Sequence, residues 1–201
     1  MSIIKLNNRA VKDATAVGSI TGLGNLKFIS RSTASTSSSL SITSGINSTY
    51  KEYIFYFNNI QPATDGAFFQ FNMSTDGGSN YNVTKTSTAV RNFHSEAGSS
   101  PLFDFLGGLA LAQSTAYQTL LENQGNGSDE SLCGYLHIFE PSSTTFAKHY
   151  LSQAQGYQLN NAANGQHTGG YGNTTSAIDA IDFKMSSGNI SSGTIDMYGV
   201  L

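Results

Sequence analysis

Four histidines, His94, His137, His149 and His167, are the side chains of this chain best suited to metal binding or acid–base chemistry. His137 and Glu140 are three residues apart in an alternating segment, so a strand would point them to opposite faces. If the segments carrying His137 and His149 pair as a hairpin, the two imidazoles could lie opposite each other. Two histidines without a carboxylate or cysteine make a weak site, and no HExxH pattern occurs. We therefore expect no metal and no cofactor.

Serine nucleophiles and paired carboxylates are the next candidates for chemistry. The chain has no G-x-S-x-G pattern for a nucleophilic serine. Asp104 with Glu122, or Asp179 with Asp182, could form the carboxylate pair of a glycosidase, which needs a separation of roughly 5–10 Å. Asp179 and Asp182, however, are three apart on one expected strand and should face opposite ways. We predict that the chain is not an enzyme and has no catalytic residue. A glycan-degrading enzyme is kept as the third of three hypotheses on the function.

The single cysteine, Cys133, excludes an intramolecular disulfide framework. It lies in SLCGYLHIF, which reads as a strand, and a buried, unreactive thiol is favoured over a nucleophile.

Three aromatic side chains could contact a glycan or a protein partner. Tyr157, His167 and Tyr171 lie among Asn, Gln and Gly, and the segment NNAANGQHTGGYGNTTS (residues 160–176) is expected to be a loop too polar to pack a core. Planar rings cover the C–H faces of sugars and amides bond their hydroxyls, while Tyr/Asn/Gly loops also suit protein contacts. A loop without a ligand is the remaining alternative.

Composition limits the possible partners. Charged residues make up 11% of the 201 residues, against roughly 25% in an average globular protein. The net charge is −3, and the scattered Lys and Arg residues form no basic patch that could bind nucleic acid. MSIIKLNNRA lacks the apolar run of a secretory signal, and no apolar run is long enough for a membrane span, so we expect synthesis in a cytoplasm and no membrane insertion.

Period-two alternation, broken by turn residues, recurs along the chain and predicts about eight to ten strands. KEYIFYFNNI (residues 51–60) has apolar residues on both faces and should be a central, doubly covered strand. CGYLHIFEP and TFAKHYLSQA should pair across PSST. The last residues alternate twice around SSGNISSG, which predicts a terminal hairpin. Residues 98–130 are the least determined: LALAQSTAYQTLLEN could be a short helix, but strand and loop are favoured.

These patterns predict an all-β fold: a single antiparallel β-sandwich, jelly-roll-like, over residues 25–201, with an extended N-terminal arm over residues 1–24. A frayed terminus is the alternative for the arm. Against fraying, the arm contains apolar side chains that need a surface to bury them. They are Ile3, Ile4, Leu6, Val11, Val17, Ile20 and Leu23.

Nearly the whole chain resembles a family of small virion structural proteins, decoration or tail-fibre-like, from marine and cyanobacterial tailed bacteriophages. The resemblance rests on SIIKLNNRAVKDATAVGSITGLGNLKFI, YKEYIFYFNNIQPATDGAFFQFNMSTDGGSNYN, LHIFEPSSTTFAKHY and IDFKMSSGNISSGTIDMYGV. It implies a particle-bound β domain that contacts other virion proteins of the capsid or tail. It also implies a homo-oligomer, for which a trimer is one expected form, and it transfers no functional residue.

The resulting hypothesis is a non-enzymatic virion protein, a surface decoration or a fibre or appendage subunit anchored through its arm. The alternative is a receptor-binding module for host cell-surface glycans.

Overall fold

Residues 26–201, which the computed structural model describes, form twelve β-strands and no helix. The all-β prediction is confirmed, and the strands outnumber the eight to ten expected. They are β1 (Leu26–Thr33), β2 (Leu40–Ile42), β3 (Glu52–Pro62), β4 (Ala67–Ser74), β5 (Lys85–Ser95), β6 (Leu102–Phe105), β7 (Gln118–Gln124), β8 (Leu132–Phe139), β9 (Lys148–Gln158), β10 (Ala162–Gly172), β11 (Ala180–Met185) and β12 (Ile190–Val200). In residues 98–130 the preference for strand and loop over a helix is confirmed by β6 and β7.

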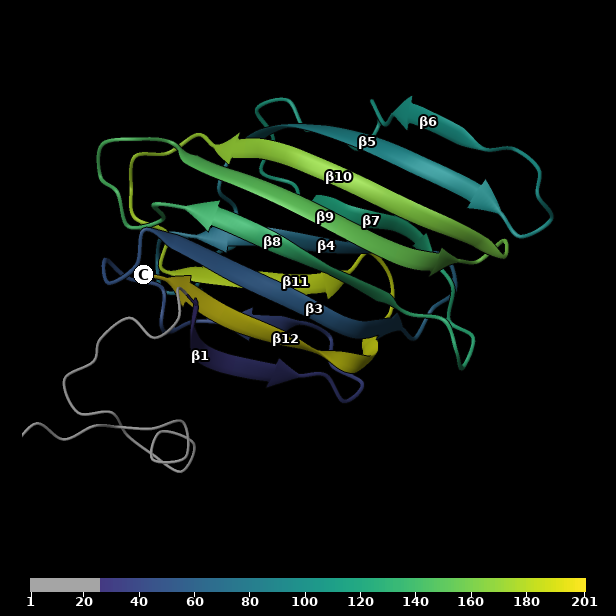
Figure 1. The fold of residues 1–201 in the computed structure, drawn as a ribbon. Helices are drawn as coiled ribbons and strands as arrows, with labels where there is room; N and C mark the ends of the chain where they lie inside the picture. The colour runs from purple at the N-terminus through teal and green to yellow at the C-terminus, as the bar shows by residue number, and fades with distance from the viewer. Residues whose placement is uncertain (1–25) are drawn as a thin grey trace, which may run out of the picture.

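The strands form an antiparallel sheet that folds back on itself and is nearly closed into a barrel (Figure 1). The main order is β1-β12-β3-β8-β9-β7-β4-β11-β2, and β10, β5 and β6 continue from the other side of β9. β7 pairs with β9 at a single position, Gln124 with Gln158, and the sheet turns over there. In Figure 1, β4, β7 and β11 consequently lie behind β3, β8 and β9.

The core lies between these two parts of the sheet. Phe183 on β11 is fully buried, and its ring centre lies 5.7 Å from that of Phe55 and 5.4 Å from that of Phe57, both on β3. Phe69 and Phe71 on β4, the neighbour of β11, complete the cluster, with ring centres at 5.9 and 6.4 Å from Phe183. The alternating apolar residues of these strands therefore meet as the sequence pattern predicts.

β3 confirms the expected central strand, since β12 and β8 pair with its two edges. Tyr53, Phe55 and Phe57 face the core. Ile54 on the opposite side is only 5% exposed, whereas Tyr56 is half-buried. The predicted pairing of the next two long segments is also confirmed, because β8 and β9 form a hairpin.

The predicted terminal hairpin is wrong. β11 and β12 exist as strands, but β11 pairs with β4 and β2 whereas β12 pairs with β1 and β3. The turn between them carries the chain from one part of the sheet to the other. Alternation shows that each strand has one buried face. Strands on both sides of the core alternate in this way, so alternation does not identify which strand pairs with which.

The expected arm, residues 1–24, and its apolar side chains lie outside the described residues. Within residues 26–201 there is no helix long and apolar enough to cross a membrane.

Candidate binding face

Four neighbouring strands, β8, β9, β10 and β5, present one solvent-facing surface, which we call the outer face. Alternation along each strand sends every second side chain to it. The side chains that it exposes wholly or in part include Cys133, Tyr135, His137, Phe139, His149, Leu151, Gln153, Gln155, Tyr157, Ala163, His167, Tyr171, Thr86, Thr88, Val90, Asn92 and His94. All four histidines of the chain therefore lie on the same face of one sheet, which their spacing in the sequence does not indicate.

The expectation that residues 160–176 form a loop is wrong, because most of this segment is β10, paired along its whole length with β9 and β5. Several of its inward side chains are polar and donate hydrogen bonds to β7, although the side-chain oxygens of Asn164 and Gln166 have no partner among the described residues. Asn164 donates to the backbone oxygen of Glu122, and Gln166 donates to that of Thr119, both on β7. Polar residues that bond a neighbouring backbone can be buried in a strand, so polarity alone does not predict a loop.

Tyr157, His167 and Tyr171 all lie on the outer face, but they do not form one cluster. Tyr157 is paired across the strands with Ala163, His167 follows four residues later on β10, and Tyr171 four residues after that. Four residues of a strand span about 13 Å. Tyr171 instead lies beside His149, with 6.1 Å between ring centres. A hydrogen bond with the side chain of Glu96 raises the pKa of Tyr157 to about 12.

Two depressions lie on the outer face. One, of about 400 Å³, lies over Gly169 and includes His137, Leu151, Gln153 and His167 in its lining. The other, of about 500 Å³, is bordered by Tyr157 and the residues around it. Both depressions occur where β10 has a small residue, Gly169 in the first and Ala163 in the second. A small residue in a row of larger side chains leaves a hollow.

Aromatic rings lead across the sheet towards the first depression. They run from Phe28 on β1 through Tyr198 on β12 and Tyr56 on β3 to Tyr135 on β8, with successive ring centres 5.5, 5.7 and 6.4 Å apart. His137 follows, 5.0 Å from Tyr135. These residues are far apart in the sequence, and only the pairing of β1, β12, β3 and β8 puts them in one row.

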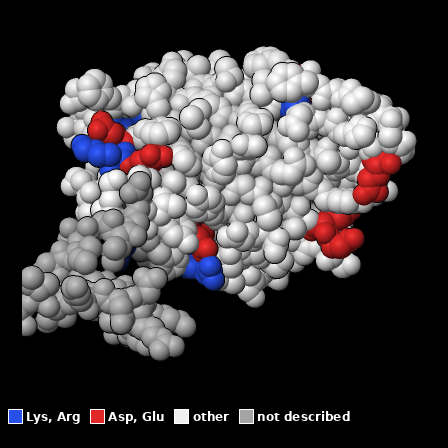
Figure 2. All heavy atoms as spheres, viewed as in Figure 1, with Lys and Arg blue, Asp and Glu red and all other residues white. Residues whose placement is uncertain are grey.

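Charged groups are nearly absent from the middle of this surface. Figure 2 shows red and blue atoms at its margins and uncharged atoms over β8, β9 and β10. A surface with rings and amides, and without Lys, Arg, Asp or Glu at its middle, is suited to an uncharged ligand, since no permanently charged group there compensates the desolvation of a charged one.

The histidine pair considered from sequence is not formed as expected. The β8–β9 hairpin places His137 opposite Leu151 rather than His149, so the imidazoles are diagonal neighbours. His137 Nδ1 instead contacts the carboxylate of Glu52 at 2.5 Å. Within residues 26–201 no group of three or more His, Cys, Asp or Glu side chains is arranged to hold a metal ion.

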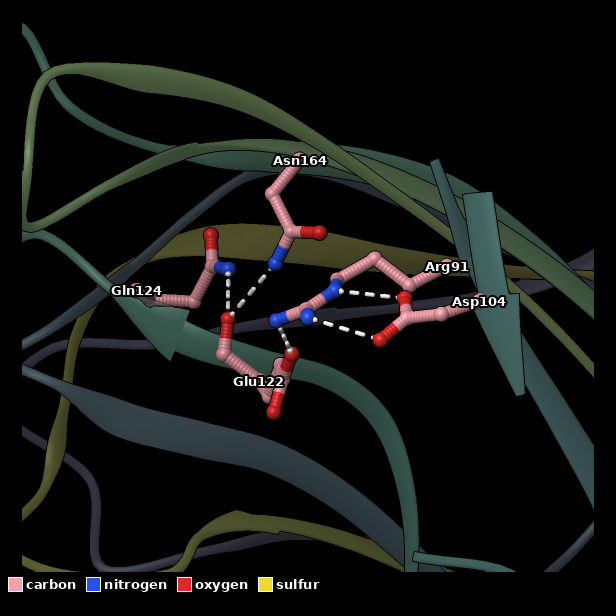
Figure 3. A network of polar contacts seen from close by, with 5 residues as sticks. All are labelled: Arg91, Asp104, Glu122, Gln124 and Asn164. Carbon is pink, nitrogen blue, oxygen red and sulfur yellow. Dashed lines mark hydrogen bonds and ion pairs between the residues drawn. The ribbon is translucent and has the colours of Figure 1, made fainter. Parts of the chain in front are cut away.

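Asp104 and Glu122, one of the two carboxylate pairs considered, are brought together by Arg91 (Figure 3). Arg91 Nη2 lies 3.0 Å from Asp104 and Arg91 Nη1 lies 2.5 Å from Glu122. Gln124 and Asn164 donate to the backbone oxygen of Glu122 behind this network. These ion pairs join β5, β6 and β7, so the carboxylates have a structural role here.

The other pair is also engaged in bonds. Asp179 accepts a hydrogen bond from the backbone of Gly77, and Asp182 accepts bonds from the hydroxyls of Ser41 and Tyr117. The prediction that Cys133 is buried is wrong, because its side chain is exposed on the outer surface of β8. Alternation on β8 assigns it to the same face as Tyr135 and His137.

No family model matches the chain, and no curated protein or solved structure matches it either.

Proposed function

We propose that this chain is a non-enzymatic structural protein of a bacteriophage particle, a surface decoration or a subunit of a fibre or appendage. The observation that carries the proposal is the apolar surface of β6. Phe103 is 74% exposed and Phe105 is 61% exposed, and among the described residues β6 pairs only with β5. Large apolar groups beside an open strand edge suit a protein that is covered by neighbouring subunits.

The resemblance to virion proteins supports the same setting, and the low charge of the chain suits a module that contacts other proteins over wide neutral surfaces. We further propose that the fold is a jelly-roll-like sandwich. In support, β11 and β12 are consecutive but belong to different parts of the folded sheet, as crossing connections of such folds require.

The test is the particle itself. Particles of the phage that encodes this chain are purified, their proteins are identified by mass spectrometry, and the particle is imaged by cryo-electron microscopy. We expect the chain at a fixed copy number on the capsid or the tail. Its absence from purified particles would overturn the proposal.

Anchoring through residues 1–24 is a separate part of the proposal. Full-length protein with Ile3, Ile4 and Leu6 changed to Ser should bind depleted particles much more weakly than wild type. The matched control changes Asn7 and Asn8 to Ser in the same segment and should bind normally. Equal binding by the two variants would contradict an apolar anchor.

We propose a homo-oligomer, with a trimer as one expected form, in which β6 contributes to the contact. Light scattering during size-exclusion chromatography measures the mass of wild type and of Phe103→Ser. The variant should dissociate more readily on dilution, while its melting temperature should barely change because Phe103 is mostly exposed. A wild-type monomer at all concentrations would refute this part.

The second candidate is a receptor-binding module for host cell-surface glycans. It is favoured by the position of Tyr157, His167 and Tyr171 on one nearly uncharged face. Binding of labelled protein to host envelopes, and its reduction in Tyr171→Ala, test it. Absence of envelope binding would count against this candidate.

A further inference from the structure

We infer that the depression over Gly169 is a binding site for one neutral pyranose unit of a glycan. The inference rests on the glycan-recognition candidate, to which it adds a specific site and a ligand class. Gly169 lies between Leu151 on β9 and Thr88 on β5, and it has no side chain to fill the row. The resulting hollow of about 400 Å³ lies within the range of small-molecule sites, roughly 300–1,000 Å³.

Apolar surfaces border this hollow. The rings of Tyr135 and His137 lie side by side on β8, 5.0 Å apart and inclined at 55°. Leu151, which is 56% exposed, lies between them and Gly169. A pyranose ring has C–H groups on its faces, and aromatic and aliphatic side chains can cover them while its hydroxyls stay at the edge.

Hydrogen-bonding groups of both kinds are held in position at the same place. The Tyr135 hydroxyl donates to Gln153 Oε1 at 3.0 Å, which orients the amide and leaves Gln153 Nε2 as a donor. The oxygen of the Tyr135 hydroxyl keeps a lone pair as an acceptor, and the contact of His137 Nδ1 with Glu52 fixes the imidazole beside it. Neighbouring sugar hydroxyls both donate and accept, so a donor and an acceptor on one wall match them.

The charge of the site selects among sugars. None of the side chains that line the hollow is Lys, Arg, Asp or Glu; its histidines are His137, which contacts the carboxylate of Glu52, and His167. A sulfated, phosphorylated or carboxylated sugar would lose hydration here without a Lys or Arg partner. The site therefore suits neutral hexoses and N-acetylhexosamines.

The inference also separates the three aromatic residues predicted from sequence. His167 lines the hollow, whereas Tyr157 borders the second depression and Tyr171 lies beside His149. Binding of a single sugar in this hollow should consequently depend on His167, whereas Tyr171 could contact only another unit of a longer glycan.

Titration of the ¹⁵N-labelled full-length chain with glucose, galactose, mannose and N-acetylglucosamine, followed by NMR, tests the site. At least one sugar should cause saturable shifts of the Leu151, Gln153 and Gly169 amides, with a Kd on the order of 1 mM, or about −4 kcal/mol. Gly169→Val should weaken this binding at least tenfold by filling the hollow. The closest atom to a Cβ at Gly169 is Leu151 Cδ2, at 3.1 Å, and this flexible tip can move; the backbone oxygen of Tyr150, at 3.9 Å, is in ordinary contact.

Ala163→Val is the matched control, because it adds bulk to the same face of β10 outside the hollow, and its affinity should equal that of wild type. Gln153→Ala is a second variant that removes the donor without adding bulk and should also bind more weakly. Absence of saturable shifts with all four sugars, or equal affinity of wild type, Gly169→Val and Gln153→Ala, would overturn the inference. Shifts caused only by sulfated galactose would overturn the neutral ligand class. Absence of the chain from particles would instead contradict the structural role and leave the titration result standing.

Discussion

The ammonium group of Lys85 on β5 donates a hydrogen bond to the amide oxygen of Asn72 on β4, and both side chains are completely buried. Its second bond, at 2.7 Å, goes to the backbone oxygen of Val83. Among the described residues no carboxylate forms an ion pair with this lysine. Burial without a counter-charge lowers the pKa of Lys85 to about 7.

Lys85 should make stability depend on pH above neutrality. Between its folded pKa of about 7 and its ordinary value of 10.5, the unfolded chain binds a proton that the folded chain does not. Raising the pH through this window therefore increases the free energy of unfolding, whereas below pH 7 the amine is charged in both states and its destabilising effect is complete. The increase should be a few kcal/mol, since each pKa unit corresponds to about 1.4 kcal/mol.

Urea denaturation of wild type and Lys85→Met at intervals from pH 7 to pH 10 measures this effect. The variant should show a much smaller rise with pH. Some rise should remain, because burial also lowers the pKa of Lys148. The same slope in both proteins would contradict a buried, unpaired Lys85.

Removal of Arg91 should destabilise the contact of β5 with β6 and β7. Arg91→Met leaves the carboxylate of Glu122, only 10% exposed, without its ion-pair partner. We expect a loss of about 2–4 kcal/mol from the free energy of unfolding. The double variant Arg91→Met/Glu122→Gln should recover part of it, because no charge is then left buried. A double variant less stable than Arg91→Met would show that the ion pair is not the cause.

Phe183 should be among the most sensitive core positions. Its ring contacts four phenylalanines from the two facing parts of the sheet. Phe183→Ala should therefore reduce the free energy of unfolding by about 3–5 kcal/mol. Phe146→Ala, at a position 65% exposed between β8 and β9, is the matched control and should change it by less than about 0.5 kcal/mol. Similar losses for both variants in chemical denaturation would contradict this core.

Gly134 on β8 should not tolerate even a methyl group. A Cβ there would clash with the backbone oxygen of Gln153 and lie 2.7 Å from Ala154 Cα, and these backbone atoms of β9 cannot move independently. Gly134→Ala should lower the melting temperature by several degrees, which corresponds to about 1–3 kcal/mol. Gly108→Ala, where no atom lies within 4 Å of the added Cβ, should leave it unchanged. A Gly134→Ala protein as stable as the control would show that β8 and β9 are farther apart.

Local alternation was sufficient to place most strands, including β3, β4 and the β8–β9 hairpin, because side-chain period is a property of each segment alone. It failed for β10, whose Asn164 and Gln166 are buried against backbone oxygens of β7. Those acceptors are 42 and 47 residues away along the chain, so no local pattern contains them. Cys133 was misplaced for a related reason: alternation assigns it to one face of β8 but does not show which face is covered.

The amino-acid sequence by itself determined that the chain is all-β, weakly charged and rich in aromatic side chains that need partners, because composition and period-two patterns act locally. Only the tertiary structure decided that β11 and β12 separate, that His137, Gln153 and Gly169 border one hollow, and that Arg91 joins two carboxylates. The physical reason is that cross-strand neighbours are set by pairing and register over the whole sheet, and a change of one residue in register would reverse the face of every side chain.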